Sequence, residues 1–177
     1  MDYKYATSDL NRRHELKVMH MAFPGITNVR IATKEQDISG YDYALTHPRI
    51  PQELFIDVKR ARAGRKRYWK NDIPDVTIEL VNNGLKGTIG WSLDTSKMTD
   101  AYLFLWDDDL DSYAVMEAKA LWRAVKKHKG HWCEEYFMDL IPTGARGVLG
   151  TVVFLPVDVL RDAVANEQKL AKNVIAT

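Results

Sequence analysis

The sequence predicts a mixed α/β fold in which helices pack against a central sheet. Three observations support this class: a helix-like segment comes first, three strand-like runs separated by turn residues follow, and further strands then alternate with two helix-like segments. The chain has 177 residues, of which 46% are hydrophobic. This length suits one domain, residues 1–177, with a core of substantial size.

Each element has its own local signal. Residues 9–22 carry apolar side chains at helical spacing and end at Phe23-Pro24-Gly25, which predicts a helix. Strands are predicted over 27–33, 41–46 and 53–61, with a turn at 35–40, and we expect these three strands to form an antiparallel meander. The remaining predictions are strands at 75–81, 86–93 and 100–108, a helix at 115–128, a strand ending near Pro156 and a helix starting near Val157.

Composition narrows the function classes only in part. The 25 basic and 24 acidic residues give a net charge of +1, which indicates no particular class of binding partner. The single cysteine, Cys133, leaves neither an internal disulfide nor a cysteine-built metal site, and it fits a reducing compartment. The polar N-terminus does not resemble a signal peptide, and no apolar run approaches the roughly 20 residues of a membrane span. We therefore expect a cytoplasmic protein without a membrane partner.

The third predicted strand carries a charged pair inside an otherwise apolar run. Asp57 and Lys59 share one face of this strand because side chains alternate with period two. Asp42 stands 15 residues before Asp57, and it lies beside Asp57 if the second and third strands form a hairpin. Two adjacent carboxylates repel each other unless a cation lies between them, and hard oxygen ligands favour Mg²⁺ or Mn²⁺. Asp37 competes with Asp42 for this role, but we expect Asp37 to lie in the turn.

These residues resemble the motif of the PD-(D/E)xK phosphodiesterases, the restriction-endonuclease-like nucleases. The family pattern is a glutamate in the first helix, an aspartate at the second strand and (D/E)-x-K on the third, here Glu15, Asp42 and Asp57-Val58-Lys59. Tyr41 stands where the family usually has proline, and Asp57 where glutamate is commoner. The resemblance implies an αβββαβ core over roughly residues 8–160, with Glu15, Asp42 and Asp57 as metal ligands and with all three and Lys59 as catalytic residues.

A basic segment follows the charged pair directly. Residues 59–70, KRARAGRKRYWK, hold seven Lys or Arg residues with two aromatic residues between them. Basic side chains neutralise phosphates and aromatic rings stack on bases, so this segment favours nucleic-acid binding over a solvated linker. The residues predicted to contact nucleic acid are Arg60, Arg62, Arg65, Lys66, Arg67, Trp69 and Lys70.

The sequence thus predicts a Mg²⁺-dependent nuclease that hydrolyses DNA, in preference to RNA, by metal-assisted attack of water, with Lys59 assisting the nucleophile. Two alternatives stay open. One is a nucleic-acid-binding protein of the same fold without a working site. The other is a protein-interaction module that uses Tyr68, Trp69 and Trp132. The sequence also leaves open a homodimer, the cutting mode and the cut-site preference.

Overall fold

The chain begins with a helix and an antiparallel meander, as predicted. The computed structural model describes residues 9–61, 69, 71–107, 109–142 and 149–175. β1 pairs with β2 and β2 pairs with β3, in both cases antiparallel. The expected turn after β1 is instead a short helix, because Thr33 and Gln36 form a capping box at its start. The bounds are α1 (Asp9–Ala22), β1 (Asn28–Ile31), α2 (Lys34–Ile38), β2 (Tyr43–His47) and β3 (Ile50–Ala61).

Two later strands complete the first sheet, whose order is β1-β2-β3-β6-β7. β6 (Ala101–Trp106) runs parallel to β3, and β7 (Asp109–Glu117) runs antiparallel to β6. The predicted helix at 115–128 therefore starts later, as α3 (Ala118–Glu135). Residues before Ala118 are extended because Ala114 and Met116 alternate into the core while Val115 stays exposed.

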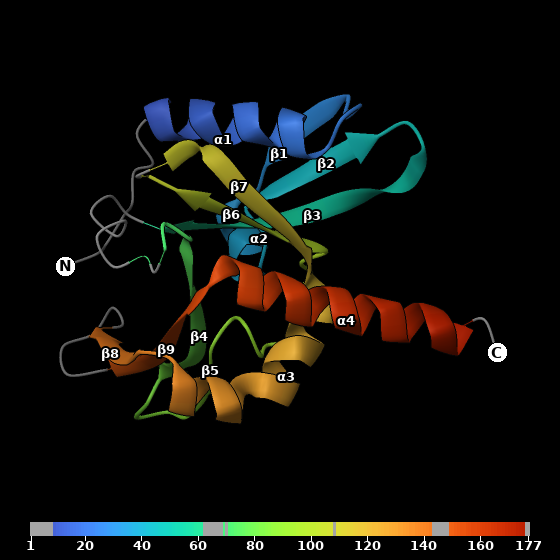
Figure 1. Ribbon diagram of the computed structural model, residues 1–177. Coiled ribbons are helices and arrows are strands. Elements are labelled where there is room, and N and C mark those ends of the chain that lie inside the picture. The colour runs from blue at the N-terminus through green and yellow to red at the C-terminus, as the bar shows by residue number, and fades with distance from the viewer. Residues whose placement is uncertain (1–8, 62–68, 70, 108, 143–148, 176–177) are drawn as a thin grey trace.

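A second sheet, of order β5-β4-β9-β8, lies below the first in the view of Figure 1. All its neighbouring strands are antiparallel. The sequence predicts strands near β4, β5 and β9, but neither β8 nor a separate second sheet. Its strands and the last helix are β4 (Asp75–Asn83), β5 (Thr88–Ile89), β8 (Met138–Pro142), β9 (Leu149–Pro156) and α4 (Val157–Ile175).

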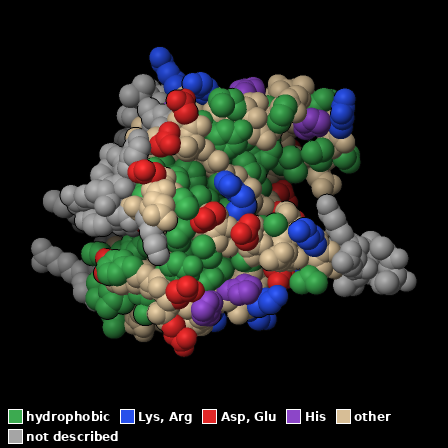
Figure 2. All heavy atoms as spheres, in the orientation of Figure 1, with side chains coloured by type: hydrophobic (Ala, Val, Ile, Leu, Met, Phe, Trp, Pro, Cys, Tyr) green, Lys and Arg blue, Asp and Glu red, His purple; other side chains and the backbone are tan. Residues whose placement is uncertain are grey.

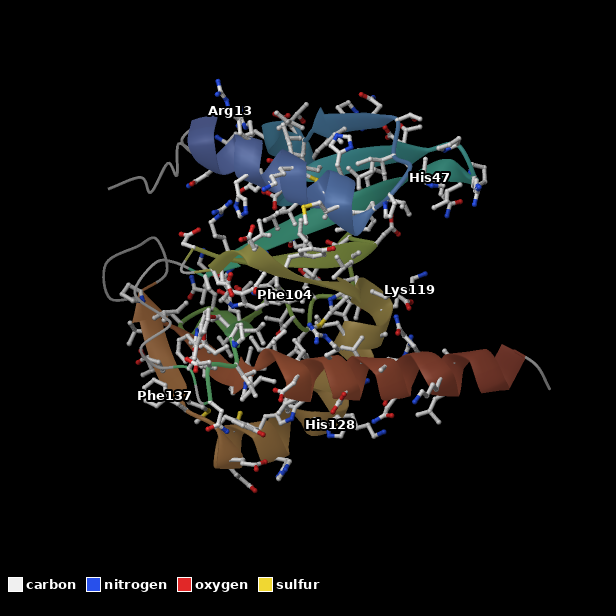
Figure 3. The ribbon with its side chains drawn as sticks, turned by 45° about the horizontal axis from the view of Figure 1, so that its top comes forward. Arg13, His47, Phe104, Lys119, His128 and Phe137 are labelled. Atoms are coloured by element: carbon white, nitrogen blue, oxygen red, sulfur yellow. The ribbon has the colours of Figure 1, made fainter. Side chains whose placement is uncertain are left out.

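The first sheet separates two hydrophobic clusters. On one face, α1 packs Val18 and Met19 against Ile56 and neighbouring strand residues. On the other face, Tyr102, Phe104 and Trp106 of β6 join side chains of the second sheet, α3 and α4. Figure 3 shows Phe104 of β6 between these upper and lower parts of the molecule. Because Ile56 and Val58 face α1, alternation along β3 directs Asp57 and Lys59 to the opposite face, toward the second sheet.

The predicted mixed α/β class is confirmed, with a mixed sheet and four helices in the described part of the chain. The finer αβββαβ order is not confirmed. Parallel strands need a long crossover, and the one from β3 to β6 contains β4 and β5 where the expected order has a helix. Among the described residues, no helix is both long and apolar enough to span a membrane.

Candidate functional site

Asp42 lies where the chain enters β2, and its side chain is fixed against β3. The preceding turn ends at Gly40, whose φ of +106° favours glycine. The amide of Asp42 donates to the carbonyl of Ile56 at 2.8 Å. Its Oδ2 accepts the amide N–H of Val58 at 2.7 Å. The carboxylate therefore continues the hydrogen bonding between β2 and β3 ahead of the first residue of β2. It lies beside Asp57.

Asp57 and Lys59 form an ion pair on one face of β3. The Nζ of Lys59 lies 2.8 Å from Oδ2 of Asp57, and Asp57 is only 9% exposed. The same Nζ lies 4.9 Å from the ring centroid of Trp91 and 5.9 Å from that of Tyr102. Both distances are in the range of cation–π contacts, so two rings and one carboxylate hold the ammonium in place.

The two aspartates interact strongly. Burial raises the pKa of Asp42 to about 7, and the negative charge of Asp57 is the next largest cause. The Val58 amide and the Lys59 charge oppose this rise in the pKa of Asp42 without cancelling it. Near pH 7, the pair therefore holds a proton for part of the time, which relieves the repulsion between the carboxylates.

A divalent cation would relieve the same repulsion. The donor atoms here are carboxylate oxygens, which match the hard-ligand preference of Mg²⁺ and Mn²⁺. Within the described ranges, no group of three or more His, Cys, Asp or Glu side chains is placed to hold a metal ion. Mg²⁺ is commonly held by one or two carboxylates together with water and substrate phosphates, so the pair of Asp42 and Asp57 fits this ion.

The segment before β6 fastens the turn that positions Asp42. The hydroxyl of Thr99 donates to the carbonyl of Gly40. The Met98 amide donates to the carbonyl of Ser39 at 3.0 Å, and the Lys97 Nζ donates to that of Ile38 at 2.7 Å. These three hydrogen bonds tie β6, which neighbours β3, to the entrance of β2. The position of Asp42 is thus set by β3 on one side and by the segment before β6 on the other.

Glu79 and Trp91 complete the wall around Lys59, and sequence reasoning missed both. The Trp91 amide donates to Oε2 of Glu79 at 3.3 Å, and the Ser92 hydroxyl donates to the Glu79 carbonyl at 2.6 Å. A Cβ on Gly90 would lie 2.0 Å from that carbonyl oxygen, so only glycine allows this approach. Burial raises the pKa of Glu79, while the Trp91 amide and the Lys59 charge lower it. The signal in the sequence was the alternation of Val76 and Ile78, which places the Glu79 carboxylate on the opposite face of the strand.

The structure does not bring Glu15 to the aspartate pair. Its Oε2 accepts the Tyr43 hydroxyl at 2.5 Å, and its Oε1 lies 3.3 Å from an Arg60 nitrogen. These contacts lie on the α1 side of the first sheet, whereas Asp57 and Lys59 face away from α1. Glu15 thus joins α1 to β2 and β3, and the structure does not bring this predicted metal ligand together with Asp57 and Lys59.

Arg60 is the centre of this second charge cluster. Besides Glu15, its guanidinium lies 2.5 Å from Oδ1 of Asp107. Its side chain is only 15% exposed. Arg60, predicted to contact nucleic acid, is thus placed between two carboxylates of the protein. Trp69, also predicted to contact nucleic acid, packs partly buried against the larger core cluster. Arg62, Arg65, Lys66, Arg67 and Lys70 lie outside the described residues.

Removal of Arg60 tests this structural role. We expect Arg60→Ala to lower the free energy of unfolding by about 3 kcal/mol, because Glu15 and Asp107 would lose their shared counter-charge. Urea denaturation measures the change, and Arg49→Ala, at an exposed arginine in the β2–β3 turn, is the matched control. The control should stay within about 0.5 kcal/mol of the parent protein. Equal effects of the two substitutions would show that Arg60 does not stabilise the cluster.

The competing acid, Asp37, lies exposed on α2, so Asp42 is the acid that the structure places against β3. No protein-family model matches the chain, and no curated protein or solved structure is significantly similar to it. The chemistry of the site must therefore be judged from its own geometry.

Proposed function

We propose that this protein is a Mg²⁺-dependent nuclease that hydrolyses phosphodiester bonds of DNA. The observation that carries the proposal is the cluster of Asp42, Asp57 and Lys59. Two carboxylates interact closely enough to help raise the pKa of Asp42 to about 7, and one ammonium lies 2.8 Å from Asp57. Such a cluster offers positions for a cation and for a phosphate oxygen side by side.

The resemblance to the PD-(D/E)xK nucleases supports the same function. Its two motif segments, around Asp42 and at Asp57-Val58-Lys59, lie on adjacent antiparallel strands. The strand order β1-β2-β3-β6, with β3 parallel to β6, is compatible with a restriction-endonuclease-like sheet, although the crossover carries strands. The preference for DNA over RNA rests on this resemblance, and the basic segment at 59–70 adds a sequence argument for a nucleic-acid substrate.

Each residue of the cluster has a distinct task in this proposal. Asp42 and Asp57 would hold the cation through their carboxylate oxygens. When bound, Mg²⁺ supplies positive charge next to the phosphate and lowers the pKa of a coordinated water. Lys59 donates hydrogen bonds to a phosphate oxygen or to the attacking water and stabilises the negative charge that develops. Trp91 and Tyr102 limit the directions in which this ammonium can point.

A cleavage assay tests the proposal. Purified protein is incubated with end-labelled single-stranded, duplex and branched DNA and with matching RNAs, in Mg²⁺, in Mn²⁺ and in EDTA. We expect DNA cleavage in either cation and none in EDTA. Binding of DNA without cleavage under every condition would instead favour a non-catalytic nucleic-acid-binding protein. Absence of binding to any nucleic acid would overturn both interpretations.

The stability of the metal-free protein should also respond to Asp42. An acid with a raised pKa in the folded state destabilises that state as pH rises from its ordinary value of 3.8 to about 7. We therefore expect Asp42→Asn to stabilise the metal-free protein at pH 8 by on the order of 2 kcal/mol, with the gain vanishing near pH 4. Urea denaturation in EDTA at both values measures this, and a gain independent of pH would contradict the assignment.

A further inference from the structure

A cleft begins at the candidate site and runs between the two sheets. Its volume is about 200 Å³. Two residues of the candidate site, Val58 and Lys59, line this cleft. The Val58 amide donates to Asp42, and the Lys59 ammonium pairs with Asp57. A group in the cleft would therefore be a direct neighbour of a phosphate bound at the aspartate pair. The other walls come from β4, Trp91, the end of β6, and one residue each of β8 and β9.

The β4 wall carries the hydroxyl and carboxylate groups of the cleft. Val76 and Ile78 point into the core, so Thr77 and Glu79 lie on the opposite face of β4. Glu79 pairs in register with Val152 of β9, which also lines the cleft. The cleft thus offers the Thr77 hydroxyl and the carboxylates of Asp75 and Glu79 as hydrogen-bond acceptors. The Trp91 amide keeps Glu79 close to Trp91.

The remaining walls are aromatic and aliphatic. Trp91, Phe104 and Trp106 line the cleft together with Ile141 and Val152. The apolar character continues beyond it, because Phe137 and Leu140 are 68% and 58% exposed, and Figure 2 shows apolar side chains gathered over β8 and β9. Aromatic walls with a few acceptors suit a flat heterocycle that carries N–H donors.

Size and charge narrow the ligand further. A volume of about 200 Å³ is below the roughly 300–1,000 Å³ of sites for drug-sized molecules, so it accommodates one ring system and not two. Glu79 repels a phosphate from the interior, whereas Lys59 attracts one at the mouth. A ligand with a phosphate at Lys59 and a neutral ring further in satisfies both conditions.

We propose that the cleft binds one unpaired nucleobase of the strand being cut, next to the phosphate held at Asp42, Asp57 and Lys59. This inference rests on the proposed nuclease function and specifies its substrate class. A base within a duplex is stacked and paired, so it could enter only after extrusion. The preferred substrate is therefore single-stranded nucleic acid or an unpaired segment such as a flap, gap or loop.

The first test fills the cleft without touching the catalytic residues. Thr77→Phe adds a ring at a partly exposed position of β4, where phenylalanine suits a strand. Its control is Thr46→Phe, at an exposed position of β2 near the β2–β3 turn. Both are made in a cleavage-deficient Asp57→Asn background and titrated with a single-stranded oligonucleotide containing the fluorescent base 2-aminopurine. We expect quenching with the background protein and the control, and at least about fivefold weaker binding with Thr77→Phe.

The second test uses the cleavage-competent protein and varies the substrate. Cutting of single-stranded DNA should exceed cutting of a fully paired duplex at least about tenfold, given the cost of extruding a base. An abasic residue moved along the single strand should reduce cutting at one position relative to the cleaved bond. Equal cutting of duplex and single strand, insensitive to the abasic residue and to Thr77→Phe, would overturn the inference but leave the nuclease function standing. Absence of cutting on every substrate would overturn the function itself.

Discussion

Asp57→Asn is expected to slow Mg²⁺-dependent DNA cleavage by more than about 100-fold. A decrease of this size exceeds the usual effect of changing a residue that only supports a metal ligand. The substitution keeps the shape of the side chain but removes the charge that would bind the cation and that pairs with Lys59. Single-turnover cleavage at saturating DNA measures the rate, so a change in DNA affinity cannot imitate the effect.

Asp37→Asn provides the matched control, because Asp37 lies exposed on α2 only five residues before Asp42. We expect this variant to keep the parental rate within about twofold, since surface substitutions far from a site have small effects. A full rate for Asp57→Asn, with its circular dichroism spectrum unchanged, would remove Asp57 from the site.

Lys59→Met should separate chemistry from binding. The substitution retains an unbranched side chain between Trp91 and Tyr102 but removes the ammonium. Loss of one donor to developing charge costs roughly 100- to 1,000-fold in rate, and we expect a decrease of that size in the single-turnover rate. DNA affinity should change by less than about tenfold, because one phosphate contact among several contributes little to binding.

Fluorescence anisotropy with labelled DNA in Ca²⁺ measures affinity, and Lys17→Met, at an exposed lysine of α1, is the control. If Lys59→Met loses affinity but keeps the parental single-turnover rate at saturating DNA, Lys59 serves binding alone. If the variant keeps the parental rate, the ammonium has no part in the reaction.

Local geometry explains which parts of the site could be predicted from sequence. Asp57 and Lys59 share a face because of strand alternation, and Asp42 reaches β3 because a hairpin joins the two strands. Both relations involve residues at most 17 positions apart along the chain, and the structure retains both.

The placement of Glu15 depended on information that periodicity does not contain. A helix can dock on either face of a sheet, and α1 docks on the face of Tyr43 and Ile56, away from Asp57. Arg60 illustrates the same limit. It belongs to a basic run in the sequence, yet alternation along β3 directs its side chain toward Glu15 and Asp107.

The second sheet is the largest difference between the fold predicted from the sequence and the observed fold. β8 was missed because its exposed Met138 and Leu140 show no clean polar alternation, and its pairing with β9 is set by tertiary contacts. The consequence for the site is direct, since β4 supplies Glu79 and the following segment supplies Trp91, both of which border Lys59. These contacts join strands whose pairing the sequence does not specify.

Titration of metal-free protein with Mn²⁺, followed by electron paramagnetic resonance, tests the cation site most directly, because bound Mn²⁺ loses the sharp signal of the free ion. We expect the parent protein to bind Mn²⁺ saturably and Mg²⁺ to compete for the same position. In the double variant Asp42→Asn/Asp57→Asn, the affinity should fall at least about tenfold, as both proposed oxygen donors lose their charge. Binding of equal strength to the parent protein and the double variant would contradict the central claim that these two aspartates hold the catalytic cation.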